Sequence, residues 1–184
     1  MIRTRVGYAG GTTENPTYHN IGNHAETVQI DFDPSIISYK ELLSVFWDSH
    51  NPVYGGAYGQ YRSIILYHSD NQRMLAENTK ADLEKSLDTE ISTSIQPVGT
   101  FTQAEFYHQK YYLQADPVLA KEIISWHSAR QDVIDSTATA RINGYIAGYG
   151  NKATLLEEID TYGLSEEALI YLRDNSRASL GSSD

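Results

Sequence analysis

The sequence predicts an α+β fold, and two observations lead to that prediction. Over residues 1–114, segments with the two-residue apolar alternation of strands are interleaved with segments of helical periodicity. Beyond Asp116-Pro117, an N-cap residue followed by a proline that suits the first helical position, only helical signals follow. We therefore expect one α+β domain over residues 1–114 and a C-terminal helical extension over residues 115–184.

The strands are expected where apolar residues alternate and turn residues follow. The clearest case has Val28, Ile30 and Phe32 alternating with polar residues, which predicts that one face of this strand is buried. Asp33-Pro34 ends it. The four expected strands are 6–9, 24–33, 61–68 and 91–95.

The helices are expected where a capping residue precedes a periodic apolar stripe. Ser38 and Glu41 form a capping box, and an apolar face of Tyr39, Leu42, Leu43 and Phe46 follows. Ser69 to Gln72 gives a second capping box. The expected helices are 39–49, 70–87, 105–113, 117–132, 136–147, 153–162 and 165–174.

Composition excludes several function classes. The formal net charge of -10 argues against nucleic acid and anionic membrane surfaces as partners, since both need a basic surface. No apolar run reaches the roughly 20 residues of a spanning helix, and no signal peptide is visible, so we expect a cytoplasmic protein. The sequence has no cysteine, so it contains no disulfide, thiolate metal site or cysteine nucleophile.

Two groups of residues are candidates for chemistry. Glu26 lies near the start of a strand, eight positions after Tyr18; a carboxyl beside phenols in an apolar pocket would be held neutral and could donate a proton. The alternative is a solvated strand residue. A tyrosine-rich loop that includes Tyr58 and ends in Tyr61 could bind a small polarised oxygen, or it could simply be a packed aromatic loop.

The six histidines give little support for a metal site, because no pair has the i,i+4 spacing of a helical zinc motif. His19 and His24 could approach each other across a loop, but single polar histidines are the better interpretation. We expect no metal and no bound cofactor.

Several ordered motifs resemble one known family, the S-specific (A-type) peptide methionine sulfoxide reductases. The first is the glycine-rich stretch Gly7-Tyr8-Ala9-Gly10-Gly11-Thr12-Thr13-Glu14-Asn15-Pro16-Thr17-Tyr18, followed by His24-Ala25-Glu26. The later ones are Asp33-Pro34, Val45-Phe46-Trp47, His50-Asn51-Pro52, Gln60-Tyr61-Arg62-Ser63, Ala104-Glu105 and Tyr107-His108-Gln109. The resemblance covers residues 1 to about 114.

The resemblance implies a ferredoxin-like core and a thiol mechanism. In the family a cysteine thiolate attacks the sulfoxide sulfur and becomes a sulfenic acid, which a second thiol reduces; thioredoxin is the usual final reductant. By motif, Glu26 corresponds to the proton donor. Tyr18 and Tyr61 correspond to the phenols that hold the sulfoxide oxygen, and Tyr58 could share that binding role. The implied substrate is a peptide or protein that contains methionine-S-sulfoxide.

The sequence departs from the family at its start. The family's nucleophile lies in a Gly-Cys-Phe-Trp motif upstream of the segment that corresponds to 3–8, together with the fold's first strand and helix. We expect that loss of an inner strand leaves open sheet edges and an uncovered apolar face, so that this chain by itself is inactive and marginally stable or prone to aggregate.

Two explanations fit this departure. A GTG codon is read as valine inside a gene but as methionine at a start. If the start at Met1 was assigned to an internal GTG, too far downstream, the segment that carries the cysteine would be left out of this sequence. The alternative is a cysteine-less relative that serves as a binding or scaffold module for methionine-containing peptides.

Overall fold

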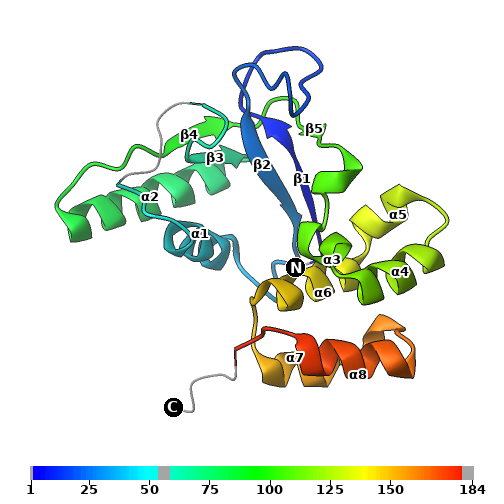
Figure 1. Cartoon of the computed structure of the whole chain (residues 1–184). Helices are drawn as coiled ribbons and strands as arrows, with labels where there is room; N and C mark the ends of the chain where they lie inside the picture. The colour runs from blue at the N-terminus through cyan, green and yellow to red at the C-terminus, as the bar shows by residue number, and fades with distance from the viewer. Residues whose placement is uncertain (1, 54–58, 180–184) are drawn as a thin grey trace. The chain divides into compact units, whose positions relative to one another are not determined.

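The fold of the computed structural model, which describes residues 2–53 and 59–179, is α+β as predicted (Figure 1). The strands are β1 (Arg3–Ala9), β2 (Ala25–Asp31), β3 (Ile64–Tyr67), β4 (Ser94–Pro97) and β5 (Thr102–Gln103). The helices are α1 (Tyr39–Asp48), α2 (Asp70–Leu87), α3 (Tyr111–Ala115), α4 (Pro117–Trp126), α5 (Arg130–Asp135), α6 (Thr137–Ala147), α7 (Lys152–Glu158) and α8 (Glu166–Asn175), with 3-10 turns η1 (Phe106–His108) and η2 (Ile159–Tyr162).

The chain divides into two compact units. One contains residues 6–105, and the other contains residues 2–5 together with the chain from residue 106 onward. The beginning of β1 therefore belongs to the helical unit, although the rest of the strand belongs to the first unit. A domain boundary at residue 114 stays a prediction.

The first unit contains two separate small sheets. One has the strand order β2-β1-β5, and the other pairs β3 with β4. β1 and β5 are antiparallel, with Tyr8 opposite Thr102, whereas β3 and β4 are parallel, with Ile65 opposite Ile95. Helix α2 connects β3 to β4, because parallel neighbours need a long crossover connection.

Helices α1 and α2 pack with β3 around an apolar core (Figure 1). The core residues are Leu43, Trp47, Ile65, Ala76 and Ile91. The Trp47 indole N–H donates to Thr79 Oγ1 at 3.1 Å, so the buried polar end of the ring is satisfied.

Of the two predicted capping boxes, one forms completely and the other forms only in part. At α1 the Ser38 and Glu41 capping box forms in both directions, as predicted. At α2 the Ser69 hydroxyl accepts from the Gln72 N–H, but the Gln72 side chain accepts instead from the His68 N–H at 2.7 Å. The second capping box is therefore only half formed.

The prediction that the Val28 and Ile30 face of β2 is buried is wrong. Val28 is 55% exposed and Ile30 is 36% exposed. β2 is the last strand of its sheet, and within residues 2–53 and 59–105 a groove separates this face from α1 and β3. The alternation of the sequence is that of a buried strand, but the cover which would bury it is absent from this part of the chain.

The second unit is a set of short helices around one apolar core. Leu113, Leu119, Ile123, Ile142, Leu155 and Leu172 are almost completely buried there. Arg3 and Arg5 form ion pairs with Asp135, at 3.7 Å and 2.7 Å, so the start of β1 is held to α5.

Two helices predicted as single elements are interrupted by non-helical residues, and the predicted helix 153–162 continues from α7 into the 3-10 turn η2. The segment 117–132 breaks into α4 and α5, because His127 adopts an extended backbone at the end of α4. The segment 105–113 breaks at Lys110, whose φ of 48° is left-handed. The predicted boundary signals are confirmed: the Asp116 side chain caps α4, and Ser165 caps α8.

Across the described ranges, no helix combines the length and the apolar character needed to cross a membrane.

Candidate functional site

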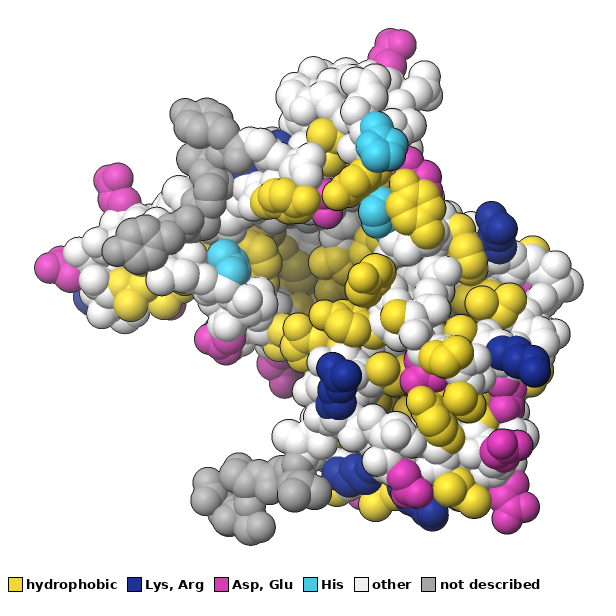
Figure 2. All heavy atoms as spheres, viewed as in Figure 1, with side chains coloured by type: hydrophobic (Ala, Val, Ile, Leu, Met, Phe, Trp, Pro, Cys, Tyr) yellow, Lys and Arg dark blue, Asp and Glu magenta, His cyan; other side chains and the backbone are white. Residues whose placement is uncertain are grey.

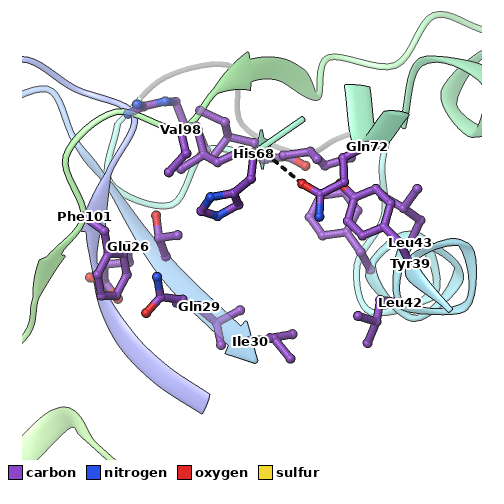
Figure 3. A pocket seen from close by; sticks show the side chains of 18 of the residues that line it. Glu26, Gln29, Ile30, Tyr39, Leu42, Leu43, His68, Gln72, Val98 and Phe101 are labelled. Carbon is purple, nitrogen blue, oxygen red and sulfur yellow. Dashed lines mark hydrogen bonds between the residues drawn. The ribbon is translucent and has the colours of Figure 1, made fainter. Parts of the chain in front are cut away.

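A groove of about 600 Å³ crosses the first unit (Figure 2). One wall is β2, and the opposite wall is α1 with β3. Figure 3 shows Ile30 of β2 on one side, with Leu42 and Tyr39 of α1 on the other. Apolar side chains dominate the lining, and polar ones come from residues 26, 27, 29, 50, 51, 61–63, 68 and 72.

Glu26 lies on the β2 wall of this groove and is the second residue of the strand. Its backbone N–H donates to the Gln60 carbonyl at 2.8 Å, which ties the strand to the segment that carries Tyr61. The Glu26 side chain is exposed, which agrees with the alternative of a solvated strand residue and not with a carboxyl in an apolar pocket. The groove is open along this wall, so water reaches the carboxyl.

Tyr61 lines the same groove and is 71% exposed. Its neighbour Arg62 fixes the segment, since one guanidinium nitrogen donates to the Gly10 carbonyl at 2.9 Å and another to the Gly59 carbonyl at 3.3 Å. The structure therefore brings Glu26 and Tyr61 to one groove with the phenol free to meet a ligand oxygen.

Tyr18 is not among the described residues that line the groove. Its backbone N–H donates to Glu105 Oε1 at 3.2 Å, and Glu105 Oε2 accepts from the Tyr8 hydroxyl at 2.6 Å. Glu105 thus holds the Tyr18 segment against β1. The sequence alone indicates no role for Glu105, although the motif Ala104-Glu105 contains it.

The loop between β1 and β2 is held by His24, which is only 3% exposed. The Gly11 N–H donates to His24 Nδ1 at 3.2 Å, so Nε2 carries the proton and donates to the Thr13 carbonyl at 2.9 Å. A Cβ on Gly11 would lie 2.6 Å from the backbone nitrogen of His24, so only glycine fits. The histidine is a structural residue that fixes the start of the strand carrying Glu26.

His50 is a further polar residue in the groove wall, and the sequence alone indicates no role for it. Its Nδ1–H donates to the Phe46 carbonyl at 2.9 Å, so Nε2 accepts from the Ser63 hydroxyl at 2.9 Å. Ser63 Oγ lies 2.7 Å from Thr93 Oγ1. This chain of hydrogen bonds fixes the end of α1 to the strand that follows Tyr61.

Tyr58 lies outside the described residues. Among the residues that the structure does describe, no three histidine or acidic side chains are arranged to hold a metal ion.

The family model "Peptide methionine sulfoxide reductase" matches residues 1–142, so the match continues beyond residue 114. A Drosophila melanogaster peptide methionine sulfoxide reductase is 39% identical over 173 residues, which cover 90% of this chain and 67% of that protein. The A5 reductase of rice is 42% identical and covers 80% of this chain; the chain spans 59% of the rice protein. The helical region therefore has counterparts in relatives.

Two solved structures share the fold. Mxr1 from Saccharomyces cerevisiae in its reduced form has a TM-score of 0.56 at 29% identity, covering 62% of this chain and 71% of that one. Methionine sulfoxide reductase A of Corynebacterium diphtheriae has a TM-score of 0.51 at 32% identity, covering 62% of this chain and 64% of that one.

Proposed function

The chain belongs to the peptide methionine sulfoxide reductase family, and we propose that it provides the acid and phenol groups for thiol-dependent reduction of methionine-S-sulfoxide to methionine. The observation that carries the proposal is the shared groove of Glu26 and Tyr61, two residues at the family's motif positions that come from different segments. The 184 residues contain no cysteine, so the thiol has to come from polypeptide outside them.

The proposed reaction divides the work between these groups. The Tyr61 hydroxyl donates a hydrogen bond to the sulfoxide oxygen, and the Glu26 carboxyl supplies a proton to that oxygen as it leaves the methionine sulfur. The attacking thiol takes the oxygen and becomes a sulfenic acid while methionine is released. A second thiol then forms a disulfide with it and releases water.

Tyr18 is proposed as a second phenol for the oxygen, on its motif position alone. Its segment is anchored through Glu105, so a small movement of the loop would have to bring the hydroxyl to the groove. For the dithiol that regenerates the enzyme we propose a thioredoxin, on the family resemblance.

The test compares this chain with a version that is extended before Met1 by the family's first strand and first helix, including the Gly-Cys-Phe-Trp motif. With dithiothreitol and a methionine-S-sulfoxide peptide, the chain alone should give no product, and the extended protein should turn over. In the extended protein Glu26→Gln should slow the sulfoxide step by about 10²–10⁴-fold, the usual contribution of a general acid.

The matched control is Glu14→Gln, a change of the same kind at an exposed carboxyl in the loop after β1. It should leave the rate unchanged. Turnover by the cysteine-free chain would refute the requirement for a thiol from outside these residues. A full rate in Glu26→Gln would show that Glu26 is not the proton donor.

The second candidate is a non-catalytic module that binds methionine-containing peptides. The absence of cysteine from these residues favours it. This module would bind the sulfoxide peptide through Tyr61, and the extended protein would bind it as tightly but give no methionine.

A further inference from the structure

We propose that Glu105 is a positioning residue of the sulfoxide site: its carboxylate fixes the backbone at Tyr18 and thereby sets where the Tyr18 phenol meets the sulfoxide oxygen. The inference rests on the proposed function and deepens it, because it assigns part of the preference for a sulfoxide over a sulfide to a residue away from the groove. Glu105 is not among the described residues that line the groove, so its role is exerted through Tyr18 and not on the substrate.

The first argument is the geometry of the carboxylate. Glu105 Oε2 accepts from the Tyr8 hydroxyl at 2.6 Å, and Glu105 Oε1 accepts from the Tyr18 backbone N–H at 3.2 Å. The shorter distance is that of a hydrogen bond to an ionised carboxylate, which is about twice as strong as a neutral one. One side chain therefore joins strand β1 to the loop that carries Tyr18.

The second argument is that the backbone which carries Glu105 is itself fixed. Strands β1 and β5 pair with Tyr8 opposite Thr102. The Ala104 N–H continues this pairing, since it donates to the Val6 carbonyl at 3.0 Å. Tyr8 and Ala104 are only 2% and 6% exposed. Glu105 therefore follows directly on a buried strand pairing, and its carboxylate is a firm point of attachment for the loop.

The third argument is that the loop holds its own shape. Asn23 Oδ1 accepts from the Thr13 N–H at 3.1 Å, across the base of the loop. Thr17 and Asn20 exchange two backbone hydrogen bonds, at 3.0 Å and 3.3 Å, around the turn that contains Tyr18. Because these internal hydrogen bonds hold the loop together, one contact at Tyr18 positions the whole turn.

The consequence concerns the reach of the phenol. Glu105 accepts from the backbone N–H of Tyr18, so it fixes the main chain of this residue and not the orientation of its ring. A loop fixed at this point has only a small movement left to make before the hydroxyl meets the oxygen. A site that hydrogen-bonds a substrate oxygen rejects an analogue without it, which here is the sulfide. Release of the Tyr18 backbone should therefore lower the preference for the sulfoxide and leave binding of the sulfide unchanged.

The test measures binding of two probes to the full chain, since a hydrogen bond to the oxygen requires no thiol. The probes are acetyl-Gly-Met-Gly-amide and the same peptide with methionine-S-sulfoxide, each titrated with NMR detection. The readout is the sulfide dissociation constant divided by the sulfoxide dissociation constant. Glu105→Asp keeps the charge but is one methylene shorter and cannot reach both donors, so this ratio should fall about fivefold, the effect of one ordinary hydrogen bond.

Further variants separate the position of the loop from the charge of Glu105. Glu105→Gln keeps the length, and its amide can accept from the Tyr18 N–H and donate to the Tyr8 hydroxyl, so the ratio should stay within about twofold of the wild type. Tyr18→Phe should lower the ratio as much as Glu105→Asp does. The double variant should lower it no further, because both changes remove the same hydrogen bond to the ligand. The matched control is Glu14→Asp, which shortens an exposed carboxyl of the same loop and should leave the ratio unchanged.

Amide hydrogen exchange at Tyr18 gives a second measurement that needs no ligand. It should become about fivefold faster in Glu105→Asp, because the N–H loses its acceptor, and should keep the wild-type rate in Glu105→Gln. Unchanged affinity for the sulfide probe shows that a variant has kept its fold.

Several outcomes would overturn the role of Glu105 while the proposed oxygen site stands. They are an unchanged ratio in Glu105→Asp, an equal loss in Glu105→Asp and Glu105→Gln, effects that add in the double variant, and an equal loss of affinity for both probes, which is a purely structural effect. A wild-type chain that binds the sulfide as tightly as the sulfoxide would instead refute the proposed oxygen site, and the role of Glu105 with it.

Discussion

Replacement of Glu158 by glutamine should destabilise the helical unit by about 2–3 kcal/mol. The Glu158 carboxylate accepts from the Arg141 guanidinium and from the hydroxyls of Tyr145 and Tyr162, the last at 2.5 Å. A hydrogen bond to a charged group contributes about 1.5–3 kcal/mol, and breaking a buried ion pair costs about 3–5 kcal/mol. The side chains of Glu158 and Arg141 remain 21% and 30% exposed, so we expect a smaller loss than for full burial.

The assay is urea unfolding followed by far-UV circular dichroism at neutral pH. Glu157→Gln is the matched control, since Glu157 is the exposed neighbour on the same helix and should change stability by less than about 0.5 kcal/mol. Equal effects of the two substitutions would refute the reasoning.

The pH dependence tests the same network. Burial would raise the pKa of Glu158, but the hydrogen bonds from Arg141, Tyr145 and Tyr162 outweigh it and hold this pKa below its ordinary value. A carboxyl whose pKa is lowered by folding stabilises the protein at pH values above its ordinary pKa. This stabilisation is lost as the pH falls through the pKa of the folded state. The difference between the wild type and Glu158→Gln should therefore shrink below pH about 4, and a constant difference would contradict the account.

Three further predictions concern other contacts. Burial lowers the pKa of Lys110 to about 8, partly opposed by Asp135 and assisted by Arg5. Lys110 therefore loses its proton at a lower pH in the folded chain than in the unfolded chain, so the free energy of unfolding should rise from pH about 8 to 9.5. Lys110→Met should flatten this rise in urea titrations. Thr79→Val removes the acceptor of the Trp47 indole and should cost about 1–2 kcal/mol by thermal melting, with Thr79→Ser close to wild type. Asp88 has a φ of 50° at the end of α2, so Asp88→Gly should raise stability by up to about 1 kcal/mol, and a loss would show that its side chain matters more than its backbone.

The sequence predicted elements whose signals are local. Ser38 with Glu41, Asp116 and Ser165 are caps that depend on residues within one turn, and each caps its helix in the structure. The breaks at Lys110 and His127 were missed because apolar periodicity continues through both, and only the backbone angles reveal the interruption.

The candidate site was predicted less completely because it depends on non-local contacts. The motifs identified Glu26 and Tyr61, which do line one groove. They could not show that Tyr18 is held by Glu105, because those residues are 87 positions apart in the sequence. The structural role of His24 also needed the structure, since its partners at residues 11 and 13 meet it only when the loop closes.

The wrong prediction for β2 and the exposed carboxyl have one cause. The alternation of Val28 and Ile30 encodes a covered strand, and a proton donor of the proposed kind needs a site with little water. Both conditions fail on the same wall of the same groove, where Glu26 and Val28 are exposed. Because both residues lie on this wall, burial of Val28 and catalytic competence of Glu26 should appear together in any version of the protein in which polypeptide fills the groove.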